Sequence, residues 1–190
     1  MKIKAAALVA TAAALWASAA SAAPATYTIE PSHTYPSFEA PHMGISFWRG
    51  KFNKSSGSVV LDEAAKTGSV DITIDTTSVD FGHDKMNEHA NGPDWFDTAK
   101  YPTATYKGKV KYSGSTPSEV DGQLTLHGVT KPVKLSIDSF KCIQHPMLKK
   151  EVCGADATAD FNRGDFGISK YADGDLGKVK LRIQVEAIKN

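Results

Sequence analysis

The strongest constraint on the fold is a strict alternation of apolar and polar residues in several separate segments. In residues 70–75, Val70, Ile72 and Ile74 alternate with acidic and hydroxyl side chains, and the same period of two recurs in residues 103–112, 123–127, 133–138 and 179–186. Such alternation is typical of antiparallel strands with one buried face and one face in water. Parallel crossover units would need continuous apolar runs separated by helices, and the sequence does not show that pattern. The chain is therefore predicted to be all-β.

Clusters of turn-forming residues separate the alternating segments at residues 55–57, 66–68, 113–115 and 172–175. Further strands are expected at residues 26–30, 37–42, 45–52, 58–62 and 155–161, which gives about eight or nine strands joined to their nearest neighbours. Residues 82–100 lack the alternation and predict a short helix around residues 84–90 and a second one starting at Pro93. A sheet of this kind buries its apolar face by stacking two sheets or by closing into a barrel.

The N-terminal residues have the pattern of an export signal. Lys2 and Lys4 precede an apolar run at residues 5–17, and Ala20-Ser21-Ala22 is a small-x-small cleavage site. We expect residues 1–22 to be a cleaved signal peptide and residues 23–190 to form one exported domain, with a periplasmic location. The alternative is an uncleaved anchor, but the apolar run falls short of the ~20 residues that a bilayer crossing needs.

The cysteine count and the charge balance narrow the function further. Cys142 and Cys153 are the two cysteines of the chain, and in an oxidising compartment such a pair predicts a disulfide. They flank a polar hairpin at residues 143–152, so the bond is expected to clamp this hairpin without touching the interior of the fold. A redox-active pair and a metal site remain alternatives, although the spacing is not Cys-x-x-Cys. The chain carries 22 basic and 21 acidic residues with no long run of one sign, so nucleic acid is not expected as a partner.

Three stretches of sequence carry a more specific pattern. They are TYTIEPSHTYPSFEAPHMG (26–44) followed by GKF (50–52), HDKMNEH (83–89) with DWFDTAKYPTATY (94–106), and GQLTLHGVTKPVKL (122–135) with FNRGDFGI (161–168). Together they resemble the YceI family of bacterial periplasmic proteins, from about Tyr27 to the C-terminus. The stretch KCIQHPMLKKEVCGADA (141–157) is similar to a cysteine-bearing hairpin found in part of that family.

The resemblance implies an extended lipocalin-like barrel of eight antiparallel strands, with a short helical segment around residues 83–98 packed at one end. Members of the family enclose long isoprenoid or fatty-chain molecules, so the resemblance implies a hydrophobic small molecule as ligand. It brings no catalytic motif, and no catalytic residue is assigned. Pro36 and Pro41 depart from an ideal second strand and fit an edge or bulged position, because proline cannot donate a ladder hydrogen bond.

If the alternating apolar faces line a barrel, strand parity predicts which side chains form its wall. These are Ile72, Ile74, Tyr106, Val110, Leu124, Leu126, Leu135, Ile137, Leu181 and Ile183. The alternative is that these side chains simply fill a solid core. Gly108 and Gly122 share the inward parity of their strands, so they leave room for a ligand chain or let a strand bend.

Polar residues near the strand ends are candidates for a mouth that contacts a ligand head group. They are His42, Arg49, His83, Asp84, Lys85 and Arg163, and a cationic side chain there would suit a phosphate or a carbonyl group. Each of them can equally be an ordinary surface residue. No metal site is predicted, because His83 and His89 are six residues apart and would not share one face of a helix.

The sequence thus favours a periplasmic carrier or store for an isoprenoid quinone, a polyprenyl lipid or a similar amphiphile. It predicts no required cofactor, leaves the oligomeric state open, and is compatible with transient contact to a membrane or a membrane protein. Two alternatives from other classes are an enzyme that acts on a lipid or uses a bound quinone as redox partner, and a structural module with a solid barrel.

Overall fold

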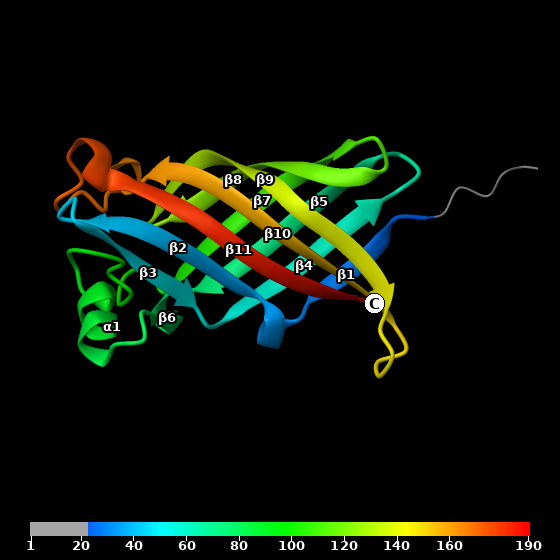
Figure 1. Ribbon diagram of the computed structural model, residues 1–190, viewed down its shortest axis with the longest axis horizontal. Coiled ribbons are helices and arrows are strands. Elements are labelled where there is room, and N and C mark those ends of the chain that lie inside the picture. The colour runs from blue at the N-terminus through cyan, green and yellow to red at the C-terminus, as the bar shows by residue number, and fades with distance from the viewer. Residues whose placement is uncertain (1–22) are drawn as a thin grey trace, which may run out of the picture.

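The computed structural model describes residues 23–190, and the expected signal peptide at residues 1–22 lies outside them. Eight strands pair side by side into a closed antiparallel barrel, in the order β1-β4-β5-β7-β8-β9-β10-β11, with β11 returning to β1 (Figure 1). This confirms the eight-stranded antiparallel barrel. The ring consists of β1 (Ala25–Ile29), β4 (Ser55–Asp62), β5 (Thr67–Asp75), β7 (Thr103–Ser113), β8 (Thr116–Leu126), β9 (Val129–Gln144), β10 (Glu151–Asn162) and β11 (Lys178–Lys189).

Three further strands lengthen the barrel wall at one end. Strand β2 (Tyr35–His42) pairs with the first half of β11, β3 (Ser46–Phe52) pairs with β2, and β6 (Val79–Asp80) pairs with β3. The 3-10 turn η1 (Pro31–His33) separates β1 from β2, and η2 (Thr76–Ser78) separates β5 from β6. Strands β1 and β2 therefore lie end to end along β11 and form one interrupted strand of the wall.

The two prolines of β2 lie where this strand has a neighbour on one side only. Residues 35–39 pair with β11 and residues 37–42 pair with β3, so Pro36 faces β11 alone and Pro41 faces β3 alone. Proline has no backbone N–H, and this costs no ladder hydrogen bond on a side where the strand has no partner. The strand is internal to the sheet, but each proline has a locally edge-like position.

The helix and a long loop lie at one end of the barrel (Figure 1). Helix α1 (Asp84–Asn91) begins after His83, whose Nδ1 accepts a hydrogen bond from the Met86 backbone N–H, as an N-cap does. The loop between β10 and β11 contains the 3-10 turns η3 (Arg163–Phe166) and η4 (Gly174–Gly177). Figure 1 shows both near the β2–β3 turn, whereas the β9–β10 hairpin and the C-terminus lie at the opposite end.

The second helix expected from Pro93 is wrong. Residues 93–96 form turns, in which the Trp95 N–H donates to Gly92 and the Phe96 N–H donates to Ala90. Asp97 then has φ 44°, a left-handed conformation that a helix cannot continue through. The turns direct Trp95 and Phe96 onto the apolar interior instead of along a helix.

The turn expected at residues 55–57 is also wrong, since these residues open strand β4 and Gly57 pairs with Ile72. A side chain at Gly57 would collide with the backbone of β5, and its φ of 137° suits glycine alone. The glycine allows two strands to approach closely, and in the sequence such a glycine looks like a turn residue. No helix among residues 23–190 has the length and hydropathy to cross a membrane.

Candidate functional site

An elongated cavity of about 880 Å³ occupies the interior of the barrel. Its size is within the range of small-molecule sites, ~300–1,000 Å³. All ten side chains that strand parity placed on the wall line this cavity: Ile72, Ile74, Tyr106, Val110, Leu124, Leu126, Leu135, Ile137, Leu181 and Ile183. Their contact with a ligand stays a prediction, but their position around one continuous space is a property of the structure.

The barrel's own side chains do not fill this space. Ile72, Ile137 and Ile183 point inward, yet each is only half-buried. Of their chain neighbours on the outer face, all are exposed except Thr73, which is also half-buried. An inward-facing side chain in a solid core would be fully buried, as in ordinary protein interiors. The accessible surface of these residues therefore borders the cavity.

The mouth of the cavity lies at the end that carries α1. Four of the lining residues are exposed to solvent, namely His42, Met43, His89 and Tyr171, and they belong to the β2–β3 turn, to α1 and to the β10–β11 loop. At the opposite end, the lining residues are all buried or half-buried. A ligand would therefore enter beside α1.

Among the described residues that line the cavity, Arg163 is the one Asp, Glu, Lys or Arg side chain. It is only 7% exposed, and its Nη1 and Nη2 donate to the backbone carbonyls of Ile168 (2.9 Å) and Tyr171 (2.8 Å). Its guanidinium carbon lies 5.0 Å from the centre of the Trp95 ring, in cation–π range. No carboxylate of residues 23–190 forms an ion pair with it, and burial lowers the pKa of its guanidinium from the ordinary value.

Two tryptophans complete the polar groups at the mouth. The Trp95 indole N–H donates to His89 Nε2 at 2.8 Å, which holds the ring that faces Arg163. The Trp48 ring packs against His42 and Phe81, and its buried Nε1 has no hydrogen-bond partner among residues 23–190. An unpaired buried donor is costly unless a ligand or a water molecule accepts from it.

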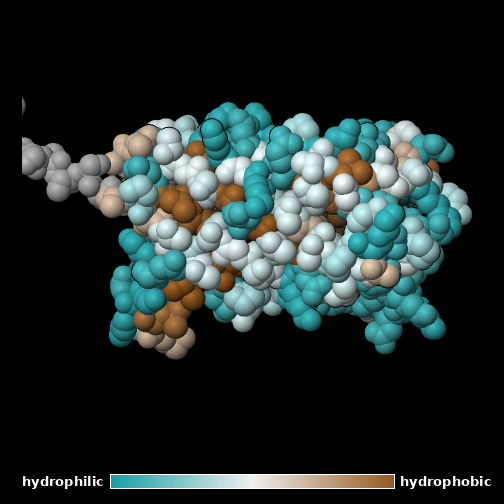
Figure 2. Space-filling view, turned by 180° about the vertical axis from the view of Figure 1, so that it is seen from behind, coloured by the Kyte–Doolittle hydropathy of each residue, from teal (hydrophilic) through white to brown (hydrophobic). Residues whose placement is uncertain are grey.

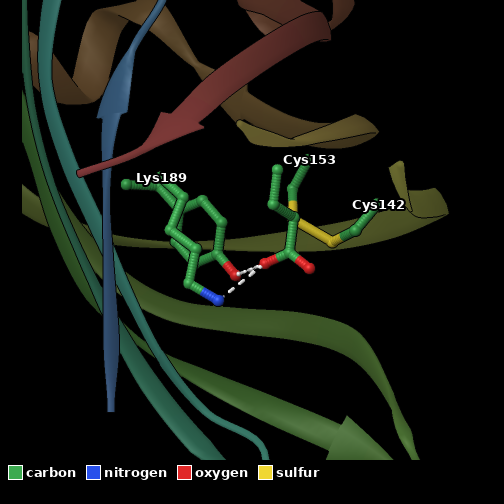
Figure 3. Close-up of a disulfide and its surroundings, with 5 residues drawn as sticks. Cys142, Cys153 and Lys189 are labelled. Carbon is green, nitrogen blue, oxygen red and sulfur yellow. Dashed lines mark hydrogen bonds and ion pairs between the residues drawn. A yellow bond between two sulfur atoms is a disulfide. The ribbon is translucent and has the colours of Figure 1, made fainter. Parts of the chain in front are cut away.

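The opposite end of the cavity is closed by a hydrogen-bonded group and a disulfide (Figure 3). The Tyr27 hydroxyl donates to Glu151 Oε1 at 2.6 Å, and Lys189 Nζ lies 3.0 Å from the same oxygen. Burial, followed by this hydrogen bond, raises the pKa of Tyr27 above its ordinary value.

Cys142 and Cys153 face each other across β9 and β10 and form the expected disulfide. Because Cys153 lines the cavity, the expectation that the bond stays clear of the barrel interior is wrong.

Comparison with known proteins identifies the fold family. The family model described as a YceI-like domain matches residues 27–187. The chain belongs to the YceI-like family. The protein YceI of Escherichia coli O6:H1 is 34% identical over 179 residues, which cover 93% of each chain. A UPF0312 protein of Vibrio parahaemolyticus is 35% identical over 151 residues, covering 76% of this chain and 80% of the relative.

Solved structures show the same barrel. BcnA of Burkholderia cenocepacia is 25% identical, with a TM-score of 0.65 over 80% of this chain and 96% of its own. The YceI protein of Campylobacter jejuni is 26% identical, with a TM-score of 0.66 over 79% and 90% of the two chains. A polyisoprenoid binding domain from Saccharophagus degradans, 16% identical, has the same fold with a TM-score of 0.60 over 86% and 98% of the two chains.

In this YceI-like barrel the six predicted mouth residues separate into two groups. His42 and Arg163 line the cavity. The other four do not, and the structure gives each a surface position. Arg49 forms an ion pair with Glu39 on the outer face of the sheet, His83 caps α1, Lys85 pairs with Glu88, and Asp84 is exposed in the first turn of α1.

Gly122 faces the barrel interior, as its parity predicts, because it lies under the Tyr106 side chain that lines the cavity, but it leaves no room for a ligand. A side chain at this position would overlap the Tyr106 ring, which already fills the space. At Gly108 an added Cβ would meet Val120 and the backbone of Asp121. Both glycines therefore serve close packing within the wall.

Sequence reasoning missed Trp48 and Trp95 as mouth residues. Trp48 lies on β3 and lines the cavity, whereas its neighbour Phe47 is exposed. Large apolar residues therefore occupy both faces of β3, and the sequence does not show which face points inward. Within the described residues, no three His, Cys, Asp or Glu side chains gather as metal ligands would. His83 and His89 instead accept hydrogen bonds from Met86 and Trp95.

Proposed function

We propose that this YceI-like protein is a periplasmic carrier that encloses a long-chain isoprenoid or a similar amphiphilic lipid, such as a quinone or a polyprenyl lipid. The observation that carries the proposal is the apolar cavity of about 880 Å³, open at one end. The Saccharophagus degradans domain of the same fold is a polyisoprenoid binding domain, which supports this ligand class. The disulfide is in keeping with an oxidising compartment such as the periplasm.

The apolar tail would supply most of the affinity. Each buried methylene group contributes about 0.8 kcal/mol, so a tail of about twenty carbons gives roughly 16 kcal/mol before the costs of association are subtracted. Among residues 23–190, the wall that would receive this tail contains no carboxylate and no lysine. The hydroxyl groups of Tyr27 and Tyr106 already donate to protein oxygens, so the inner wall offers few polar contacts.

The mouth would hold the head group. Arg163 presents a buried positive charge there that has no carboxylate partner within residues 23–190, and two of its five N–H groups are used by backbone carbonyls. A phosphate or a carbonyl oxygen would accept from the remaining N–H groups. We propose binding without turnover, because these groups suit the holding of a head group, and no cofactor is needed for it.

The test is extraction of lipid from the protein purified from its native compartment, followed by mass spectrometry. A matched pair of variants links the lipid to the cavity. Ile137→Trp places a large ring in the cavity, whereas Ser136→Trp places the same ring on the exposed outer face of the same strand. We expect wild type and Ser136→Trp to carry a long-chain lipid and Ile137→Trp to lose most of it. Wild-type protein without such lipid, from a host that makes isoprenoids, would contradict the proposal.

A further inference from the structure

The hairpin that joins β9 and β10 carries an exposed apolar patch at the end of the barrel opposite the mouth. Met147 is 82% exposed, Leu148 is 48% exposed and Ile143 is 47% exposed. Figure 2 shows apolar surface on the projection at this end of the molecule, with hydrophilic surface beside it. Three large apolar side chains exposed to water on one projecting hairpin indicate a surface that contacts a membrane or another protein.

The same hairpin is strongly cationic. Residues 139–150 contain no Asp or Glu, and the exposed Lys141, Lys149 and Lys150 form no ion pair with any residue of 23–190. The next acidic residue, Glu151, accepts from Tyr27 and pairs with Lys189. The positive charge beside the apolar patch is therefore not neutralised by the hairpin itself.

The hairpin is held in shape by the protein before anything binds. The disulfide joins Cys142 to Cys153 at its base. At the tip, His145 Nδ1 accepts from the backbone N–H groups of Met147 (3.3 Å) and Leu148 (3.2 Å), and the His145 N–H donates to Lys150 O at 2.8 Å. A tip that is already ordered loses little conformational entropy when it binds.

We propose that this hairpin docks the protein on an anionic lipid surface. Met147 and Leu148 enter the boundary between head groups and acyl chains, while the three lysines contact anionic head groups. A lipid surface fits better than a partner protein, because the patch is on a small projecting hairpin that also carries three exposed lysines, and it is not a groove. The proposal does not depend on the cavity ligand. It does imply that a docked molecule holds its mouth away from the bilayer, free to exchange ligand.

The experiment is co-sedimentation of the oxidised full-length mature protein with vesicles. One set contains phosphatidylcholine alone, and the other contains equal parts of phosphatidylcholine and phosphatidylglycerol. We expect binding to the anionic vesicles that weakens as salt is added, and little binding to the neutral ones. Met147→Ser/Leu148→Ser and Lys149→Gln/Lys150→Gln should each lower the partition coefficient by about tenfold or more.

The matched control changes the apolar tip at the mouth. Ile45 and Phe47 on the β2–β3 hairpin are 80% and 58% exposed, so Ile45→Ser/Phe47→Ser removes a similar exposed surface at the other end. This variant should bind anionic vesicles as wild type does. The proposal is overturned if wild type binds neither kind of vesicle, or if the control variant loses binding while the β9–β10 variants keep it. Lipid extraction on the same samples tests the carrier function separately.

Discussion

The Tyr106 phenol lies over Gly122 on the neighbouring strand and occupies the space that a side chain there would need. Its hydroxyl reaches across β8 and donates to Val133 O on β9 at 2.8 Å, with Val120 O at 3.2 Å. The glycine and the tyrosine therefore form one packing unit that joins three strands of the wall. Tyr106 and Leu124, which pair across β7 and β8, both line the cavity.

Gly122→Leu is expected to destabilise the barrel by about 1–3 kcal/mol, because the new side chain overlaps the Tyr106 ring. In the double variant Tyr106→Ala/Gly122→Leu, the leucine enters the vacated space. The two substitutions should therefore cost less together than the sum of the single variants. Urea unfolding of the four proteins measures this coupling, with Thr125→Leu on the other face of β8 as the control. Additive losses would show that the ring and the glycine do not share the space.

Strand parity predicted the interior wall well, because side chains in a strand alternate between its faces without exception unless a bulge intervenes. The position of Ile72 in its alternating segment is enough to place it inside once the sheet closes. The same argument was correct for Leu124 and Ile183, which come from strands far apart in the sequence.

The mouth was not predictable in the same way. Arg163 reaches the cavity because the loop after β10 folds back and offers it two carbonyls, and no periodicity describes such a loop. Arg49 had the same chemistry in the sequence, but its strand turns it to the outer face beside Glu39. Cys153 was placed outside the cavity because the sequence does not show that the base of the hairpin coincides with the barrel wall.

Reduction of the Cys142–Cys153 disulfide should lower the melting temperature. A loop with a sequence separation of 11 is worth roughly 2.5–3 kcal/mol in the chain-entropy model, which corresponds to about 5–12 °C for a domain of this size. The paired strands β9 and β10 are expected to hold the lining side chains at this end in place without the disulfide, so lipid content should change little. Calorimetry with and without reductant checks the first expectation, and extraction checks the second. Two titratable free thiols in the native protein would refute the disulfide.

Glu151 should make stability depend on pH in the acid range. The hydrogen bond from Tyr27 and then that from Lys189 hold the pKa of Glu151 below its ordinary value of 4.5, against the opposing effect of burial. A lowered folded-state pKa adds stability above about pH 4.5, and this stability disappears as the pH falls through the folded-state value. Glu151→Gln should therefore melt earlier at neutral pH and lose less stability on acidification than wild type. Glu88→Gln, which removes an exposed carboxylate on α1, is the control and should follow the wild-type pH profile.

Arg163 should set the preference for a head group without setting the affinity for the tail. In Arg163→Met the apolar wall is unchanged, but the buried charge that faces the mouth is lost. Wild type is expected to bind geranylgeranyl phosphate at least about tenfold more tightly than geranylgeraniol, since a charge-assisted hydrogen bond to a buried guanidinium contributes about 1.5–3 kcal/mol. Arg163→Met should bind both with similar affinity, near that of wild type for the alcohol.

Trp48 and Trp95 line the cavity, so their fluorescence reports both titrations. Lys170→Met removes a positive charge from the same loop, where Lys170 pairs with Asp94, and should keep the wild-type preference. The Ile168 and Tyr171 carbonyls lose their donor in Arg163→Met, so a melting curve must first show a folded protein. A folded Arg163→Met protein that still prefers the phosphate would remove Arg163 from the head-group site.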